Sequence, residues 1–409
     1  MYVLLTGARK NAGDYLIAHA ARRLFTHYLP NEEIREFPSW LPVDDVLEQI
    51  NAAAALILCG GPAVQSGLGT RIYPLLSVID RIQVPIIGLG LGWKCFPGDA
   101  TDVACARLPA HARPILQRLA TDFAITGCRD SATVEVLRNH GVHGAQLLGC
   151  PAWFEPRSWD QPLCVPKTIN RIVYTPAEAP LFADQSVAVL CWIRNRFPEA
   201  LITCSFHRGW VVDVHTEALP AASASRIRAA ALQLGVECVD ISGSVAGLER
   251  YDDYDVHIGY RVHAHLRMLA LRRPSWLIAE DSRGRGALAA HELPLVCAGR
   301  VPSTLAICER ALAALGRAGR DSTLALRRAV RRVAPRAFVR RGVVDELERV
   351  FDAELVSGYR GMRRALELIA AKRSEFADFL FALPRPPKAG ALAAPRESCG
   401  ATNSPVPTR

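Results

Sequence analysis

Short apolar runs that alternate with amphipathic segments constrain the fold of this chain more than any other feature of its sequence. In the first part of the chain, the runs that predict buried strands cover residues 2–6, 54–59, 85–88, 123–126 and 145–148. Amphipathic segments at 14–28 and 130–140 predict helices between them, and Gly141 stands where a helix commonly ends in the left-handed conformation. Such alternation is typical of a parallel sheet with helices on both faces, so we expect a doubly wound α/β domain over residues 1–155.

The alternation returns after a segment rich in Pro and Trp, residues 151–166, which we interpret as an interdomain linker. The second set of predicted strands covers residues 171–174, 201–205, 236–240, 256–259 and 276–279. We therefore expect a second α/β domain over residues 166–302. Two doubly wound domains in tandem create a ligand cleft between the carboxyl ends of their sheets, where loops supply the chemistry.

The length of the chain agrees with two domains and an appendage, because 409 residues exceed what one hydrophobic core usually organises. Residues 303–383 have helical patterning and predict a C-terminal helical appendage. Over residues 384–409, Pro, Ala, Gly and Ser dominate without periodicity, which predicts a disordered tail. The sequence has no run of about 18 apolar residues and no secretory signal, so we expect a cytoplasmic protein.

The cysteine pattern does not predict a metal or disulfide framework. Twelve cysteines are scattered along the chain without a Cys-x-x-Cys pair, and several lie inside apolar runs. His257, His263 and His265 are close in sequence, but they lack the i, i+4 spacing and the carboxylate partner of a usual zinc site. We expect reduced, buried thiols and no metal site.

Positive charge is concentrated in one segment. The formal net charge is +9, and residues 317–341 hold nine Arg against one acidic residue, Asp321. The rest of the chain is close to neutral, whereas a nucleic-acid-binding surface needs basic residues spread over a folded face. We therefore expect no nucleic-acid partner.

Two interpretations of this basic segment are open. Arg327, Arg328, Arg331 and Arg332 fall on one face of a predicted helix, with apolar residues largely opposite. Such a helix can lie on an anionic membrane, which predicts peripheral contact at the inner membrane face through residues 324–341. Alternatively, it is a solvated helix packed on the second domain.

The most informative motif is Arg261-Val262-His263. It follows a predicted strand that ends at Gly259, and it opens a helix that we expect Pro274 to stop. The motif therefore stands at a helix N-terminus, where free backbone N–H groups and the helix dipole favour anions.

A polar loop, residues 280–286, follows the next strand at the same edge of the predicted sheet. Because the carboxyl ends of parallel strands meet at one edge, Arg283 in this loop is expected to face His263. A structural interpretation is also open, with Arg261 as an interdomain salt-bridge residue and His263 as a helix cap.

The first domain repeats the arrangement at Arg129. This residue follows the predicted strand at 123–126 and would project from the carboxyl end of the sheet, while Asp130 and Ser131 are candidate caps of the next helix. The alternative is a surface Arg129 that pairs with Asp130.

Two other loops of the first domain carry weaker signals. Gly60-Gly61, after the strand at 54–59, permits close approach of a ligand to the backbone but commonly marks only a turn. Asp14 lies in the loop after the first strand, where it can cap a helix. No Gly-x-Gly-x-x-Gly motif occurs, so we expect no nicotinamide or flavin cofactor.

Taken in order, these elements resemble the polysaccharide pyruvyl transferase family. The resemblance covers roughly residues 1–300 and is carried by a loop with Gly13-Asp14, a strand ending in Gly60-Gly61, the step Arg129-Asp130-Ser131, and Arg261-Val262-His263 followed by the Asp281 loop. It implies GT-B-like domains that face each other across a cleft, the first on the acceptor side and the second on the donor side. Two positions depart from the family pattern: Pro62 replaces a frequent third glycine, and Cys150-Pro151 stands where Asp-Pro is common.

The resemblance also implies an activity. Members transfer the pyruvyl group of phosphoenolpyruvate to two hydroxyls of a sugar as a ketal, releasing phosphate and using no further cofactor. The acceptor is a polysaccharide or its lipid-linked precursor, which implies a role in exopolysaccharide or cell-envelope biosynthesis. Arg129, Arg261, Val262 and His263 would contact the donor, and Arg283 stands where some relatives carry a basic residue, often Lys.

These residues suit the implied chemistry. Phosphoenolpyruvate joins a carboxylate to a phosphate, so its site needs several guanidinium groups and N–H donors. Ketal formation requires protonation of the methylene carbon, for which His263 is the candidate acid; neighbouring Arg residues lower its pKa and a bound polyanion raises it, so we expect protonation chiefly when the donor is bound. Asp14 and Asp130 are candidate bases for the attacking hydroxyl and, alternatively, structural caps.

Two rival functions fit the same architecture. A nucleotide-sugar glycosyltransferase of GT-B fold also needs Arg residues and a helix N-terminus that face phosphates. A non-catalytic sugar-binding protein could keep the fold, although the presence of both Arg261 and His263 counts against it. Binding of phosphoenolpyruvate or of a nucleotide diphosphate separates these functions.

Overall fold

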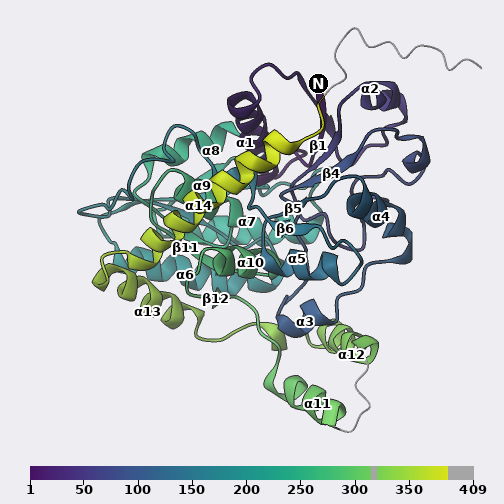
Figure 1. Cartoon of the computed structure of the whole chain (residues 1–409). Helices are drawn as coiled ribbons and strands as arrows, with labels where there is room; N and C mark the ends of the chain where they lie inside the picture. Colours follow the sequence, from purple (N-terminus) through teal and green to yellow (C-terminus); the bar gives the residue numbers. More distant parts are fainter. Residues whose placement is uncertain (315–319, 386–409) are drawn as a thin grey trace, which may run out of the picture.

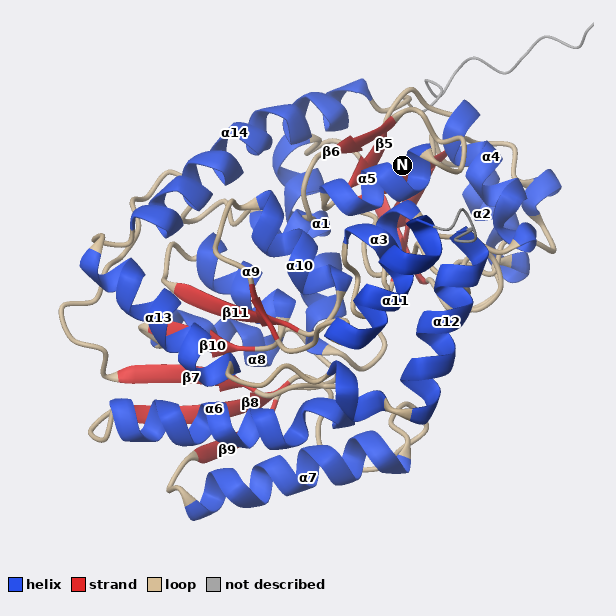
Figure 2. Ribbon diagram, turned by 90° about the horizontal axis from the view of Figure 1, so that it is seen from below, coloured by secondary structure: helices blue, strands red, loops and turns tan. Residues whose placement is uncertain are grey.

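The computed structural model describes residues 1–314 and 320–385. Within these residues, two α/β domains lie side by side and C-terminal helices extend across both of them (Figure 1). The fold class predicted from the sequence is confirmed, because each domain has a parallel sheet covered by helices (Figure 2). The predicted disordered tail lies outside the described residues from residue 386 onward.

The first domain is built on a parallel sheet with the strand order β2-β1-β3-β4. The strands are β1 (Tyr2–Thr6), β2 (Ile34–Pro38), β3 (Leu56–Cys59) and β4 (Ile86–Leu89). A second parallel pair, β5 (Thr126–Cys128) and β6 (Ala145–Leu147), joins this sheet through a bridge between Leu91 and Cys128. The helices are α1 (Ala12–Tyr28), α2 (Leu47–Asn51), α3 (Ala100–Ala104), α4 (Arg113–Thr121) and α5 (Ser131–Arg138).

The second domain has a longer parallel sheet with the order β12-β11-β10-β7-β8-β9. Its strands are β7 (Arg171–Thr175), β8 (Leu201–Phe206), β9 (Glu237–Asp240), β10 (Val256–Gly259), β11 (Ser275–Ala279) and β12 (Val296–Cys297). The helices are α6 (Ala183–Arg196), α7 (Ala218–Gln233), α8 (Ala246–Glu249), α9 (Val262–Ala270) and α10 (Ser282–Ala290).

Four further helices follow, α11 (Ser303–Ala314), α12 (Arg320–Val333), α13 (Val343–Val356) and α14 (Arg360–Ala382). Helix α14 runs back from α13 to the first domain (Figure 1), and beyond its end the Tyr2 hydroxyl donates a hydrogen bond to the Pro384 carbonyl at 2.8 Å. Helix α12 lies beside α3 of the first domain, where Arg327 pairs with Asp99 and Asp102. The expectation that the basic helix packs on the second domain is therefore wrong, because Arg327 pairs with Asp99 and Asp102 of the first domain and with Glu309 of α11, and with no acidic residue of the second domain among the described residues.

Some predicted boundaries were also wrong. Strand β2 was missed because it lies at a sheet edge and mixes charged with apolar residues, ending at Pro38, which edge strands tolerate. Strand β5 starts at Thr126, where the predicted strand ends; at Gly127 the two sheets approach closely, since a β-carbon there would lie 3.1 Å from the Gly88 carbonyl oxygen. Helix α9 ends at Ala270, well before Pro274.

The first part of the predicted linker, residues 151–155, belongs to the packed interior, whereas most of residues 156–166 are exposed or half-buried. A short helix at Pro151–Trp153 contacts both α1 of the first domain and α9 of the second, and Trp153 and Phe154 are buried. This short helix therefore holds the two domains in contact. Among the described helices, none combines the length and the apolar character needed to cross a membrane.

Candidate functional site

Two neighbouring cavities lie at the carboxyl ends of β10 and β11, where the domains meet. The small cavity, about 20 Å³, is lined by Asn11, Arg129, Tyr260, Arg261, Val262, His263, Glu280, Asp281, Arg283 and Gly284. The large cavity, about 560 Å³, shares four of these residues, Arg261, Glu280, Asp281 and Arg283. The structure thus brings together all five residues that the sequence predicted for the donor, Arg129, Arg261, Val262, His263 and Arg283.

Arg129 enters the small cavity from the first domain as a buried cation without a hydrogen-bond partner. The side chain is 5% exposed, and none of its three guanidinium nitrogens makes a hydrogen bond within the described part of the chain. Its nearest carboxylate is Asp130, with Oδ2 at 3.5 Å from Nε. Gly92 leaves the space for the guanidinium, since a β-carbon there would lie 2.2 Å from Arg129 Cζ. The alternative interpretation is therefore right about the pairing of Arg129 with Asp130 and wrong about a surface position, because both side chains are buried.

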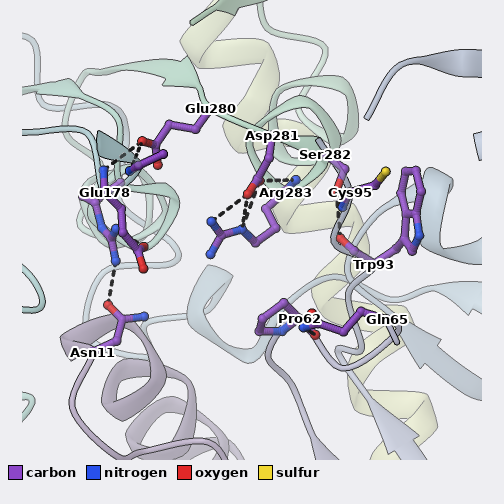
Figure 3. A network of polar contacts seen from close by, with 12 residues as sticks. Asn11, Pro62, Gln65, Trp93, Cys95, Glu178, Glu280, Asp281, Ser282 and Arg283 are labelled. Atoms are coloured by element: carbon purple, nitrogen blue, oxygen red, sulfur yellow. Dashed lines mark hydrogen bonds and ion pairs between the residues drawn. The ribbon is translucent and has the colours of Figure 1, made fainter. Parts of the chain in front are cut away.

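Arg261 is the residue that caps α9, and it connects the two domains. Its guanidinium forms an ion pair with Glu178 and donates a hydrogen bond from Nη2 to Asn11 Oδ1 at 2.8 Å (Figure 3). The backbone N–H of Arg261 donates to Thr175 Oγ1 at 3.2 Å, which fixes the turn between β10 and α9. Arg261 thus crosses the interface through a hydrogen bond to neutral Asn11, whereas its salt bridge stays within the second domain.

Arg283 forms a two-pronged ion pair with Asp281 in the middle of the cleft (Figure 3). Its Nε lies 3.0 Å from both carboxylate oxygens and its Nη2 lies 2.7 Å from Oδ2. Asp281 also caps α10 through the backbone N–H of Arg283. Burial opposes ionisation of Asp281, but the charge of Arg283 holds the pKa of this carboxyl below its usual value.

Ser282 fixes this loop against the first domain. Its hydroxyl donates to the Trp93 carbonyl at 3.0 Å and accepts from the Cys95 backbone N–H at 2.9 Å, and its own N–H donates to the Cys95 carbonyl at 3.0 Å (Figure 3). These bonds leave the neighbouring Arg283 at the interface of the domains.

His263 lies in the first turn of α9 against the start of α1. Burial lowers the pKa of His263 well below its usual range, and the charges of Arg129, Arg261 and Arg283 lower it further. Its Nε2 is buried without a hydrogen-bond partner among the described residues. The interpretation of His263 as a helix cap is wrong, because Arg261 holds that position.

The sequence comparison decides the family of this chain. Residues 11–282 match the model of the family described as polysaccharide pyruvyl transferase. The chain belongs to the polysaccharide pyruvyl transferase family. No curated protein matches the sequence. Among solved structures, the S. aureus MnaA–UDP complex is 10% identical over 94% of this chain and 98% of that one, with a TM-score of 0.49. UDP-GlcNAc 2-epimerase from Neisseria meningitidis, bound to UDP-GlcNAc, is 8% identical over 87% of this chain and 100% of that one, with a TM-score of 0.42.

Two glutamates of the site in this pyruvyl transferase family member, Glu280 and Glu178, were not predicted from the sequence. Glu280 lies between the cavities and lines both, and its Oε1 accepts the backbone N–H groups of Glu178 at 2.8 Å and Ala179 at 3.1 Å. Burial raises the pKa of Glu280 to about 7; the charge of Arg261 opposes this rise, whereas the nearby carboxylates favour it. Each glutamate follows a strand of the predicted sheet, and searching for acidic residues at those strand ends would have found them.

Glu178 forms ion pairs with two arginines of the second domain. It pairs with Arg261 and, through Oε1 at 2.7 Å, with Arg208. Burial opposes its ionisation, but the charges of Arg261, Arg283 and Arg208 hold the pKa of Glu178 well below its usual value. The Glu178 carboxylate therefore neutralises two arginines of the cleft, Arg208 and Arg261.

The remaining predicted residues lie outside both cavities. Asp130 caps α5, because its Oδ1 accepts from the Thr133 N–H at 2.7 Å and hydroxyl at 2.8 Å. Asp14 accepts a hydrogen bond from Asn11 Nδ2 at 3.2 Å, and burial raises the pKa of its carboxyl. Gly60 and Gly61 have φ of 69° and 74° and form a turn after β3. These positions shape the loops around the site, and within the described residues no three His, Cys, Asp or Glu side chains gather as a candidate metal site.

Proposed function

We propose that this protein transfers the pyruvyl group of phosphoenolpyruvate to two hydroxyls of a sugar as a ketal, releasing phosphate. The observation that carries the proposal is the buried guanidinium of Arg129 from the first domain, which makes no hydrogen bond among the described residues and shares the small cavity with Arg261, His263 and Arg283 of the second. Buried N–H groups without an acceptor are costly, so a site that holds them is prepared for an anion even though the Asp130 carboxylate lies 3.5 Å away. The acceptor's attachment to a lipid precursor and a cytoplasmic location belong to the same proposal.

The donor's two anionic groups match the charges of the site. Arg129 makes no hydrogen bond among the described residues, so its N–H groups are free to bind the donor. Arg261 and Arg283 would have to leave their ion pairs with Glu178 and Asp281 to bind the donor's carboxylate and phosphate. The backbone N–H groups that open α9 at Val262 add donors that favour anions. Because a cavity of about 20 Å³ holds only about one water molecule, the donor enters only when these side chains or the domains move apart.

His263 is the proposed general acid. In the free protein its pKa is depressed, but a bound polyanion neutralises the three neighbouring arginines and raises the pKa, so the imidazole gains a proton together with the donor. Imidazolium then protonates the methylene carbon, and an acceptor hydroxyl attacks the resulting cationic centre. The second hydroxyl displaces phosphate. Of the two hydroxyl protons lost, one replaces the proton given to the methyl group and the other leaves on phosphate.

Donor binding and turnover test this proposal separately. We expect phosphoenolpyruvate to raise the melting temperature of the full-length protein, whereas UDP and UDP-sugars do not. With a panel of free and lipid-linked glycans, phosphate release identifies an acceptor, and His263→Ala is expected to lower kcat about 10²–10⁴-fold while keeping the donor-induced shift. Stabilisation by UDP alone would favour a glycosyltransferase, and unchanged turnover in His263→Ala would exclude the assigned acid.

A further inference from the structure

The basic helix α12 supplies one wall of the large cavity. Arg331 of this helix lines the cavity together with Lys94 and Phe96 of the first domain. Its Nη1 donates to the Phe96 carbonyl at 2.8 Å, and its guanidinium lies 5.8 Å from the centre of the Phe96 ring. The segment that stood out in the sequence for its charge is thus part of the cleft.

Arg327, one turn earlier, holds α12 in this position. It is 6% exposed and forms ion pairs with Asp99 and Asp102 of the first domain and with Glu309 of α11, at 2.6–2.8 Å. Among the arginines expected on one basic face, Arg327 and Arg331 therefore turn toward the protein, and Arg328 and Arg332 remain exposed. Peripheral membrane contact through residues 324–341 stays a prediction.

Arg331 and Lys94 differ from the other cations of the cleft in having no carboxylate partner. Arg208, Arg261 and Arg283 are each paired with Glu178 or Asp281, whereas neither Arg331 nor Lys94 forms an ion pair within residues 1–314 and 320–385. The charge of Arg283, and then burial, lower the pKa of Lys94, which indicates surplus positive potential at this end of the cavity. An anionic ligand would remove that surplus.

The rest of the large cavity fits a ligand larger than the donor. Its volume, about 560 Å³, is within the range of small-molecule sites, and much of its wall is apolar, with Phe96, Phe182, Phe206 and Leu181 among the lining residues. The cavity shares Glu280 and Arg283 with the small cavity, so a sugar bound here would present hydroxyls to a donor bound there.

We propose that the large cavity binds the acceptor sugar and that Lys94 and Arg331 hold an anionic group on it, either a carboxylate or a phosphate. The assignment of this ligand as the acceptor rests on the proposed transfer reaction. The recognition of an anionic sugar rests only on the two unpaired cations, and it can be tested without the donor.

The test measures binding of glucose, glucuronate and glucose 1-phosphate to the full-length protein by titration calorimetry or ligand-detected NMR. Wild-type protein is expected to prefer an anionic sugar over glucose. Arg331→Gln and Lys94→Gln should each weaken that binding at least about tenfold, because each removes a charged hydrogen-bond donor to the anionic group. Arg332→Gln, one residue along α12 and exposed, is the matched control and should bind as the wild type does.

The outcomes distinguish a carboxylate from a phosphate on the sugar, and they distinguish failure of the anionic-sugar site from failure of the proposed transfer reaction. Tighter binding of glucuronate identifies a carboxylate, and tighter binding of glucose 1-phosphate identifies a phosphate; either result supports the site when both variants weaken it. No preference for an anionic sugar, or equal binding by wild type, Arg331→Gln and Lys94→Gln, overturns it. The Lys94 side chain makes no hydrogen bond to the protein among the described residues. The Lys94→Gln variant is therefore expected to fold as the wild type does, and weaker binding by it reports loss of the charge. If phosphoenolpyruvate fails to stabilise the wild type while these differences persist, the transfer reaction is wrong and the anionic-sugar site stands.

Discussion

Gly13 at the start of α1 lies directly against the imidazole of His263 in α9. A β-carbon at position 13 would lie 2.2 Å from His263 Nδ1, a distance that packed atoms do not reach. The proposed acid is therefore positioned by a glycine of the other domain.

Gly13→Ala should displace the His263 ring and lower turnover at least tenfold. Its donor-induced melting shift should persist, because the arginines that bind the donor are unchanged. Alanine also favours a helix by about 1 kcal/mol over glycine, so a general loss of stability is not expected from helix propensity. Gly67→Ala is the control, since its β-carbon would meet Ile72 Cδ1 at an ordinary 3.6 Å. Full activity in Gly13→Ala would show that the ring position does not matter.

Arg129→Met should abolish donor binding and also lower the stability of the free protein. The wild type buries the guanidinium 3.5 Å from the carboxylate of Asp130, and removing one partner of a buried ion pair leaves the other charge uncompensated. Melting temperatures with and without phosphoenolpyruvate measure both effects. Arg113→Met, at an exposed position on α4, controls for loss of a positive charge. A donor-induced shift retained by Arg129→Met contradicts the assignment.

The sequence predicted the buried central strands and also the edge strand β9, but it missed two other edge strands, β2 and β12. Strand β3 is an uninterrupted apolar run because helices cover both sides of its sheet. Strand β2 at an edge carries Arg35 and Glu36, so its composition resembles a loop. The β12 edge is only two residues long, which is too short for any periodicity.

Site residues were predictable when they directly follow a strand, as Arg129 and Arg261 do, because topology alone brings such positions to one edge. The pairing of Arg261 with Glu178 and the burial of Glu280 depend on how the loops after β7 and β11 pack against each other, and local sequence does not encode that. The contribution of Arg331 was equally hidden, because Asp99 and Asp102, which fix α12 on the first domain, lie more than 200 positions earlier in the chain.

Arg327→Gln should destabilise the protein by about 3–5 kcal/mol, the usual effect of removing one partner from a buried ion pair. Burial and the neighbouring Asp99 already raise the pKa of Asp102, so loss of the arginine leaves an uncompensated carboxylate pair. Denaturant unfolding measures the change, and Arg328→Gln, exposed on the same helix, is the control. Because Arg327 holds α12, binding of anionic sugars should weaken as well. Stability equal to that of the control would mean that α12 does not dock in this way.

Glu280→Gln should stabilise the protein relative to the wild type, and increasingly so as pH rises from 5 to 8. The buried carboxyl has a pKa of about 7 against an ordinary value of 4.5, so the fold prefers the protonated form. This preference contributes fully to stability below pH 4.5 and is lost as pH rises through 7. One pKa unit corresponds to about 1.4 kcal/mol, so the difference between wild type and variant should grow by about 3 kcal/mol across this range.

Denaturant unfolding at several pH values measures this difference in the free energy of unfolding. Glutamine can still accept the backbone N–H groups of Glu178 and Ala179, so the substitution removes the ionisable proton and keeps the hydrogen bonds. Glu217→Gln, an exposed carboxyl at the edge of the large cavity, is the control and should follow the wild-type pH profile. A pH-independent difference for Glu280→Gln would show that the carboxyl is ionised throughout, in which case Arg261 outweighs burial and Glu280 is a fixed negative charge between the two cavities.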